Sequence, residues 1–286
     1  MLDFRIETFL TLCDTMNYTK AALRLNLTQP AVTQHIKYLE SFYQTPLFVY
    51  NGKKLYKTPK GELLELYAKS IRHSVQKINQ MMKSPDGAVS HIHIGATKTI
   101  GEYVIAEKIN RYLEDGNKNL SLTVDNTGRL LKLLEEGKLD FALIEGTFDK
   151  SRYAYQLFRE EEFIGICAKT HRFANREIAI EDLFSESIIL RESGSGTRDI
   201  LEQFLNEHSF SIDCFQKQTE ISNFYVIKRL VGRNIGISFV YRSVMVATDC
   251  DIAAFSIKKL PVVRELNYVF LKNSMIEGDL KNFRES

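Results

Sequence analysis

The chain has 286 residues, of which 44% are hydrophobic and 26% are charged, and its formal net charge at pH 7 is +2. The composition is typical of a soluble globular protein, and the length favours two or three domains. No apolar run approaches the roughly 18 to 20 residues that span a bilayer, and the four cysteines are scattered, which speaks against a disulfide framework or a zinc site.

The charge is divided unevenly along the chain. Residues 1–90 contain 12 Lys and Arg against 7 Asp and Glu, whereas residues 91–286 contain 26 against 29. A basic first third favours contact with a polyanion. The N-terminus "MLDFRIETFL" carries an acid and lacks the basic start and cleavage site of a signal peptide, so we expect a cytoplasmic protein.

Two short helices are predicted at the N-terminus. Residues 4–16 carry apolar side chains at near-helical spacing, and residues 17–26 predict a compact second helix with Thr19 as its N-cap. The small pair Ala21 and Ala22 allows another helix to approach closely. Only a short segment separates this helix from the next, a spacing that is typical of a helix-turn-helix.

The third helix begins at "TQPAVTQHIKYLE". Thr28 is a good N-cap, and Pro30 lies in the first turn, where its missing N–H has no partner to lose. Val32, Ile36 and Leu39 form an apolar stripe that packs inward. Alone, this pattern also fits an ordinary surface helix, but after two short helices it predicts the recognition helix that enters the major groove of DNA.

A basic hairpin follows the third helix. The runs "LFVY" and "KLYK" flank Asn51 and Gly52, the pair that we expect to form the two-residue turn. Lysines at its tip are placed to meet phosphates, so the whole unit predicts a winged helix-turn-helix. Amide, hydroxyl and ammonium groups suit base edges and phosphates, and the expected DNA-binding residues are Thr28, Gln29, Pro30, Thr33, Gln34, Lys37, Lys53 and Lys54. His35 and Tyr38 lie at the margin of this face.

A long helix is predicted over residues 59–83, because Thr58 and Pro59 repeat the cap and proline that begin the third helix. Its apolar positions form a heptad-like seam consisting of Leu64, Tyr67, Ile71, Ile78 and Met81. At 1.5 Å per residue the helix is roughly 35 to 40 Å long, too long to be covered by the winged domain alone. The seam favours pairing with a second copy of the chain, and the alternative is packing on the chain's own C-terminal body. "SPDGAVS" at 84–90 indicates a hinge.

The N-terminal residues resemble the signature of LysR-type transcriptional regulators. The resemblance runs from residue 2 to about residue 65 and is carried by Phe9, Ala21, Ala22, Leu23, Leu25, Gln29, Pro30, Ala31, Val32, Thr33, Ile36, Leu39, Glu40, Leu47, Phe48, Thr58 and Gly61. Two positions depart from the family pattern. Thr33 replaces the usual Ser, and Tyr50 replaces an Arg that usually follows "LFV", which removes one expected phosphate contact.

The resemblance implies an α+β fold with a homodimeric or homotetrameric assembly that binds operator DNA and a small effector. The implied parts are a winged helix-turn-helix at 1–58, a linker and dimerisation helix at 59–83, a hinge at 84–90, and a two-lobed α/β effector-binding domain of the periplasmic-binding-protein type at 91–286. Lobe I is expected at about 91–161 and 265–286, and lobe II at about 162–264.

The pattern after residue 90 agrees with this layout. Strands are predicted at "HIHIGAT", "LSLTVDN" and "FALIEG", with helices at "GEYVIAEKINRYLEDG" and "GRLLKLLEEGKLD" between them. This alternation is typical of a parallel sheet with crossover helices. It restarts with strands at "FIGICAK", "SIIL", "QTEI" and "GISFV" and helices at 198–208 and "FYVIKRLVG". "ELNYVFLK" is expected to return to the first sheet.

Polar groups follow the predicted strands at their carboxyl ends, where α/β sheets bind small ligands. Each one alone also fits a helix cap or a loop, but together they predict a site for a small anionic metabolite. The expected ligand-binding residues are Thr97, Lys98, Thr99, Asn126, Thr127, Glu145, Ser193, Ser195 and Thr197. Glu145 counts against a bare anion unless it pairs with Lys98 or meets a cationic group of the ligand. "GSGTR" also resembles the sulfur-metabolism branch of the LysR family, which implies a sulfur oxyanion or an acetylserine-like effector.

No enzyme or cofactor motif accompanies these features. "GSGTRD" lacks the third glycine of a dinucleotide loop, no GxxxxGK loop occurs, and Ser195 does not lie in a GxSxG elbow. His91 and His93 share a strand face without nearby ligand partners, so neither a metal nor a cofactor is expected. The sequence predicts a regulator without catalytic activity. The alternative is a solute-binding or sequestering protein, which the missing export signal and the basic hairpin disfavour.

Overall fold

The computed structural model describes residues 3–83, 90–114, 116, 118–246, 251–258, 263–272, 274 and 276–286. Residues 84–89, most of the predicted hinge, lie outside the described residues, as does the side chain of Met81. Among the helices that are described, none is both long and apolar enough to cross a membrane.

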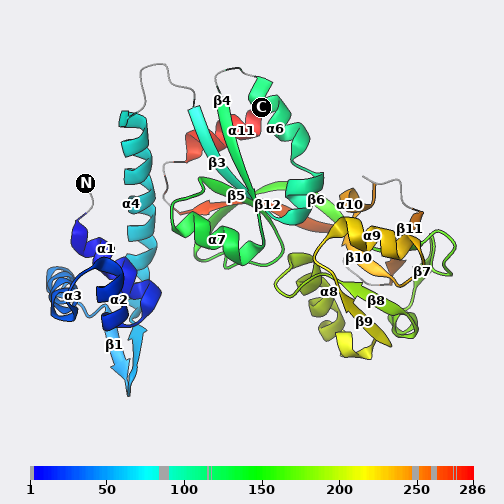
Figure 1. The fold of residues 1–286 in the computed structure, drawn as a ribbon, viewed down its shortest axis with the longest axis horizontal. Coiled ribbons are helices and arrows are strands. Elements are labelled where there is room, and N and C mark those ends of the chain that lie inside the picture. The colour runs from blue at the N-terminus through cyan, green and yellow to red at the C-terminus, as the bar shows by residue number, and fades with distance from the viewer. Residues whose placement is uncertain are drawn as a thin grey trace.

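The N-terminal domain packs three helices and a hairpin around one small core (Figure 1). Its elements are α1 (Phe4–Thr15), α2 (Tyr18–Leu25), α3 (Gln29–Tyr43), β1 (Phe48–Asn51) and β2 (Lys54–Lys57). The predicted inward stripe of α3 is confirmed, because Val32, Ile36 and Leu39 are all buried. Thr28 caps α3 by accepting a hydrogen bond from the backbone N–H of Ala31 at 3.3 Å.

Two local predictions in this domain were wrong. The N-cap of α2 is Asn17, whose side chain accepts from the backbone N–H of Lys20 at 2.9 Å, and Thr19 lies inside the helix. The hairpin turn is one residue further along, because Asn51 still pairs with Lys54 in the ladder. Gly52 therefore takes the first turn position with φ +62°, the position at which a type II′ turn requires glycine.

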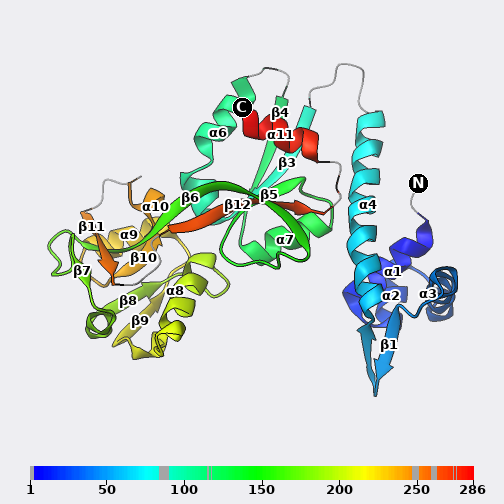
Figure 2. The ribbon, with the colours of Figure 1, turned by 180° about the vertical axis from the view of Figure 1, so that it is seen from behind.

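Helix α4 (Pro59–Lys83) stands between the N-terminal domain and the C-terminal body (Figures 1 and 2). Its start is capped as the sequence predicts. The Thr58 hydroxyl accepts from the backbone N–H of Gly61 at 2.9 Å and donates to the Pro46 carbonyl at 2.7 Å. The second bond ties the helix start to the segment that leads into the hairpin.

The C-terminal body has two α/β lobes. Up to the strand that leaves lobe I, its elements are β3 (Ser90–Ala96), α5 (Lys98–Tyr103), α6 (Ala106–Glu114), β4 (Lys118–Val124), α7 (Thr127–Glu135), β5 (Phe141–Glu145) and β6 (Tyr153–Ala168). The remainder are β7 (Glu177–Ile178), the 3-10 helix η1 (Ile180–Ser185), β8 (Ser187–Leu190), α8 (Gly196–Glu207), the 3-10 helix η2 (Ile212–Cys214), β9 (Lys217–Glu220), α9 (Phe224–Gly232), β10 (Ser238–Tyr241), α10 (Arg242–Val246), β11 (Ile252–Ile257), β12 (Val263–Leu271) and α11 (Glu277–Glu285).

Strand β6 joins the two lobes into one sheet. The strand order is β4-β3-β5-β12-β6-β11-β7, and β10 also pairs with β6. In lobe I, β3 is parallel to β4 and β5. The first part of β6 pairs with β12, and its last residues pair with β10 and β11. Strand β12 lies antiparallel beside β5, which confirms that this last strand returns to the first sheet.

The single helix predicted at 101–116 was wrong, since the chain forms α5 and α6 instead. Ile100 and Ile105 are both buried in the main core. In one continuous helix, residues five apart point roughly 140° away from each other, so both could not face the same core. The break between α5 and α6 allows both side chains to be buried.

Candidate nucleic-acid interface and inter-lobe cleft

The polar face of α3 is open to solvent. Gln29, Gln34 and Lys37 are exposed and Thr33 is half-buried. The Gln29 side-chain amide donates to the Thr33 hydroxyl at 3.1 Å, and that hydroxyl donates to the Gln29 carbonyl at 3.0 Å. The Thr33 hydroxyl is therefore already hydrogen-bonded within the helix. The side chains of Gln34 and Lys37 have no partner among the described residues and are open to a partner from outside the chain.

The other predicted DNA contacts lie on the same domain. Pro30 is exposed in the first turn of α3, and Lys53 and Lys54 are exposed at the tip of the hairpin. His35 lies differently, because its Nδ1 is 2.9 Å from the Thr8 hydroxyl of α1. The ring of Tyr38 is covered by the Arg5 guanidinium, 3.7 Å from the ring centroid. These two margin residues anchor α3 to α1.

Helix α4 has two distinct faces. Along the predicted seam, Tyr67, Ile71 and Ile78 remain between 44% and 51% exposed. Leu64, at the start of the seam, packs partly against the N-terminal core. The face that meets the C-terminal body is polar instead. The side chains of Tyr67, Ile71 and Ile78 thus stay about half exposed beside the described part of the chain.

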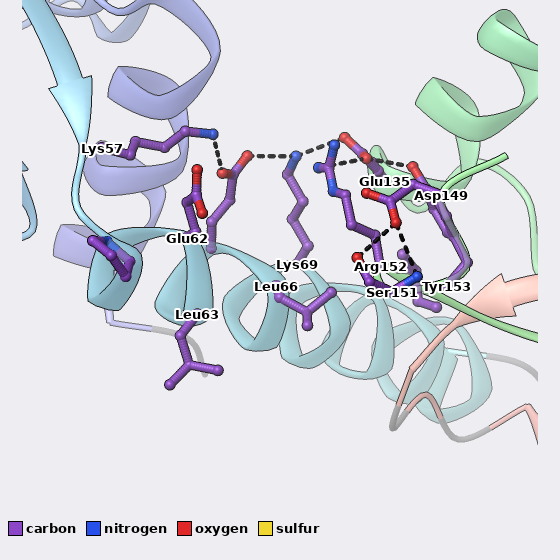
Figure 3. A pocket seen from close by; sticks show the side chains of 13 residues that line it. Lys57, Glu62, Leu63, Leu66, Lys69, Glu135, Asp149, Ser151, Arg152 and Tyr153 are labelled. Atoms are coloured by element: carbon purple, nitrogen blue, oxygen red, sulfur yellow. Dashed lines mark hydrogen bonds and ion pairs between the residues drawn. The ribbon is translucent and has the colours of Figure 1, made fainter.

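A ladder of ion pairs joins the hairpin, α4 and lobe I (Figure 3). Lys57 of β2 pairs with Glu65, and Glu65 pairs with Lys69 at 2.8 Å. Lys69 pairs with Glu135 of lobe I at 2.6 Å. Glu135 also accepts from the Tyr153 hydroxyl at 2.6 Å. The ladder runs along a cavity of about 500 Å3 between α4 and lobe I.

A second polar contact lies further along α4. The Lys77 ammonium is 3.0 Å from a carboxylate oxygen of Asp140 and also pairs with Asp279 of α11. Asp140 in turn accepts from the backbone N–H of His93 at 2.7 Å. Each of these partners belongs to lobe I, so α4 is fixed to that lobe at two places.

The predicted ligand residues converge where the two lobes meet. Most of them line one small polar cavity, whose lining residues are Thr97, Lys98, Asp125, Asn126, Thr127, Glu145, Arg191, Glu192, Ser195 and Gly196. The cavity measures about 10 Å3, room for a single water molecule. Across it, the Lys98 ammonium of lobe I is 3.0 Å from the Glu192 carboxylate of lobe II. The lobes therefore lie closed on each other.

Glu145 is the least solvated acid of this cleft. It is 3% exposed, and the Thr99 hydroxyl donates to one carboxyl oxygen at 2.9 Å while the other oxygen, Oε2, has no hydrogen-bond partner among the described residues. Burial raises the pKa of Glu145 to about 7, despite the opposing effects of the Thr99 hydrogen bond and the Arg191 charge. Near neutral pH this carboxyl group can accept or donate a proton.

Arg191 brings a positive charge to the same place. It is 4% exposed, its guanidinium binds Glu192 at 2.7 and 2.9 Å, and it lies over the Phe224 ring at 4.2 Å. Despite burial, which acts in the opposite direction, the hydrogen bonds from Arg191 and Lys98 lower the pKa of Glu192 to about 2. The Nη1 atom of Arg191 has no hydrogen-bond partner among the described residues, and the same holds for the buried hydroxyl of Thr197.

Two family models together cover nearly the whole chain. Residues 5–62 match the bacterial regulatory helix-turn-helix of the lysR family, and residues 85–286 match the LysR substrate binding domain. The chain belongs to the LysR family of transcriptional regulators. This LysR-type regulator combines a DNA-binding helix-turn-helix with an effector-binding domain, which confirms the resemblance seen in its N-terminal residues.

Known proteins that resemble this LysR-type regulator agree with the family assignment. The chain is 30% identical over 273 residues to the HTH-type transcriptional regulator CysL of Bacillus subtilis, in an alignment that covers 92% of this chain and 89% of CysL. It is 30% identical to the regulator YeiE of Escherichia coli K12, over 84% of this chain and 80% of YeiE. A Corynebacterium glutamicum OxyR mutant has the same fold, with a TM-score of 0.62 at 21% identity over 99% of this chain and 89% of the OxyR chain. The Synechocystis CcmR regulatory domain in complex with 2-PG has a TM-score of 0.62 at 19% identity over 68% and 96%.

The structure of this LysR-type regulator places most, not all, of the predicted ligand residues at the cleft. Thr99 reaches it through Glu145, and Thr197 is buried beside it in α8. Ser193 lies in an exposed turn. Sequence reasoning missed Arg191 and Glu192, although a charged pair directly after the three apolar residues that end β8 was a usable signal.

Proposed function

We propose that this regulator reads operator DNA with α3 in the major groove and the lysine-tipped hairpin on the adjacent backbone. The supporting observation is the open face of α3, where Gln34 and Lys37 extend from a helix whose opposite side is buried. Amide side chains read adenine edges and ammonium groups meet phosphates. As a DNA-binding protein it acts in the cytoplasm, by binding rather than by catalysis.

We propose further that two copies pair through the exposed seam of α4. Three large apolar side chains, Tyr67, Ile71 and Ile78, stay open to solvent along one line of a helix whose other face is docked on lobe I. Such a stripe is stabilised by a matching stripe from a second helix. Pairing places two recognition helices on one DNA, and a tetramer of two such dimers reads two sites. In this division, residues 1–58 bind DNA, 59–83 pair the copies and 91–286 bind the effector.

The effector we propose is a small anion held between the lobes. Arg191 and Lys98 supply positive charge, and Nη1 of Arg191 is a buried donor without a partner among the described residues. Because burying an unpaired donor is costly, such an atom is more stable with an acceptor on a ligand. Glu145, with its pKa near 7, donates to the anion when protonated, which removes the repulsion that a carboxylate would cause.

A panel of melting experiments tests the effector proposal on the full chain. Sulfite, sulfate, thiosulfate, O-acetylserine and N-acetylserine are tested first, because "GSGTR" after β8 resembles the sulfur-metabolism branch of the family. A ligand present at 100 times its Kd stabilises the folded state by about 2.7 kcal/mol, which gives a clear rise in melting temperature. Thr99→Ala and Ser195→Ala should reduce this rise without weakening the binding of DNA.

The outcomes distinguish a ligand-sensing regulator from a protein that only sequesters a ligand. No rise with any oxyanion removes the sulfur-effector proposal and leaves the DNA-binding half standing. A rise with ligand that never changes DNA binding supports the alternative, a ligand-sequestering protein. Retention of the full rise in both Ala variants shows that the ligand binds elsewhere.

A further inference from the structure

Helix α7 reaches from the inter-lobe cleft to α4. Its N-cap is Asn126, and Asn126 and Thr127 both line the cleft cavity. Its last residue is Glu135, the lobe I member of the ion-pair ladder. Nine residues at 1.5 Å each span about 13 Å. One short, straight element therefore has one end at the cleft and the other on the helix that carries the DNA-binding domain.

The far end of α7 is built to meet cations. A helix C-terminus leaves carbonyl groups without partners and carries a partial negative charge. Here Arg72 of α4 donates to the Glu135 carbonyl at 2.8 Å, and Lys69 of α4 binds the Glu135 carboxylate at 2.6 Å. The hydrogen bonds from Lys69 and Tyr153 lower the pKa of Glu135 against the opposing effect of burial, so the carboxylate is charged at neutral pH.

The contact continues from α4 to the DNA-binding domain. Lys69 is also 2.8 Å from Glu65, and Glu65 pairs with Lys57 on the second strand of the hairpin. Glu65 and Lys69 are both 6% exposed, so this part of the ladder is little screened by salt. Arg72 approaches Glu7 of α1 at 3.6 Å as well. Two elements of the DNA-binding domain are thereby held to the helix that Glu135 holds.

Helix α7 is also rigidly seated. Leu130 and Leu134 are fully buried in a core that they share with Ile144 of β5 and Val269 of β12. A helix with a fixed packing face moves as a body with its sheet rather than bending locally. A change in how the lobes meet at Thr127 would then also displace Glu135, at the other end of α7.

We propose that α7 transmits the state of the cleft to α4 and the hairpin, with Glu135 and Arg72 as the positioning residues through which the signal passes. This inference rests on the proposed function, because it assigns the route by which the effector site acts on the DNA-binding domain. Helix α7 contacts the cleft and α4, and α4 contacts the DNA-binding domain, so the two sites are joined by continuous contacts through which each can bias the other.

The test uses neither the effector nor the operator. Lys98→Met removes the bridge from Lys98 to Glu192 and to the Ser222 carbonyl, and so loosens the cleft. Hydrogen exchange of the full-length chain is then followed in peptides from α4 and from the hairpin. The same comparison is made in E135Q, in R72M/E135Q and in the control E136Q. Glu136 is the next residue of the chain, and its ion-pair partners among the described residues are Lys132 and Lys138 of its own lobe.

We expect Lys98→Met to change exchange in residues 62–76 several-fold in the wild-type and E136Q backgrounds. The change should fall by half or more in E135Q, and below twofold in R72M/E135Q. A merely structural role of Glu135 would shift the baseline exchange of α4 but leave the response to Lys98→Met intact. Melting curves and sedimentation check that each variant folds and keeps its oligomeric state, and E135Q alone carries the test if the double variant does not fold.

Two outcomes overturn the proposal, and they differ in what else they remove. An equal response in all four backgrounds shows that the cleft acts on α4 by another route, and leaves the proposed function intact. No response in any background shows that loosening the cleft does not reach α4, while the effector melts still report independently whether the cleft binds a ligand.

Discussion

Glu145 is the last residue of strand β5, and it lines the cleft between the lobes. Its folded-state pKa of about 7 lies above the ordinary value of 4.5, so the folded chain binds the proton more tightly than the unfolded chain. The stabilising contribution of that proton is fully present below pH 4.5 and is lost as the pH rises through 7. One pKa unit corresponds to about 1.4 kcal/mol, which gives a loss of about 3 kcal/mol.

Glu145→Gln should remove this loss, because glutamine does not titrate. Relative to the wild type, the free energy of unfolding of the variant should rise by up to about 3 kcal/mol between pH 5 and pH 8, as measured by urea denaturation. Glu192→Gln is the matched control. The pKa of Glu192 is about 2, so its contribution is constant over this range. Parallel pH profiles for Glu145→Gln and the wild type would contradict the shifted pKa.

In the proposed complex with DNA, the exposed Gln34 of α3 reads a base. Gln34→Ala should reduce the discrimination between operator variants by roughly 1–3 kcal/mol at one base position. Lys37→Ala should instead weaken binding to all sequences alike and lower the salt dependence by about one phosphate contact. Equilibrium binding to a set of operator variants at two salt concentrations distinguishes them. Unchanged discrimination in Gln34→Ala would remove its role in readout.

Helix α4 has two different faces, each with its own partner. Its polar face binds lobe I through Lys69 and Lys77, and its apolar seam stays exposed. Ile71→Asp should disrupt pairing, since a charge buried in an apolar interface is strongly unfavourable. Asn79→Asp, on an exposed position outside the seam, is the control. Sedimentation equilibrium should show a lower mass for Ile71→Asp alone, and an unchanged dimer would refute the seam.

The elements that sequence reasoning predicted are those with a local signal. The proline at the start of α3, the cap at Thr58 and the apolar period of α9 each act within a few residues, and each was predicted correctly. The first part of β6 was missed, since "QLFREEE" has no apolar run. Its partner is β12, more than a hundred residues away in the chain. A strand that depends on distant pairing leaves little trace in its own sequence.

The cleft residues likewise divide into those that the local sequence predicts and those that depend on distant contacts. Residues at the carboxyl ends of strands, such as Thr97 and Glu145, could be placed at one edge of the sheet from the order of strands and helices alone. The pairing of Lys98 with Glu192 could not, because it depends on how far the two lobes close. The polar face of α4 was missed for a related reason: its charged residues resemble a solvated helix face until Glu135 and Asp140 lie opposite them.

In the whole molecule, Gly146 of lobe I and Gly196 of lobe II meet where the two lobes approach each other. Gly146 has φ +88°, and a Cβ atom there would lie 3.2 Å from the Cα atom of Gly196. Gly194 has a similar φ of +80°, but a Cβ atom there would meet nothing within 4 Å. A comparison of substitutions at Gly146 and Gly194 therefore separates backbone strain, which both positions share, from contact between the lobes, which of these two only Gly146 makes.

Gly146→Ala should therefore press on the backbone of Gly196 and move it by a few tenths of an ångström, while Gly194→Ala should not. Both variants should lose about 1 to 3 kcal/mol of stability, because alanine disfavours positive φ. Only Gly146→Ala should also raise hydrogen exchange in peptides that contain Thr97 and Lys98, on the lobe I side of the cleft. If both variants give the wild-type exchange there, the loop at Gly146 yields without loosening the cleft. If both raise it, backbone strain rather than the Gly146–Gly196 contact controls closure.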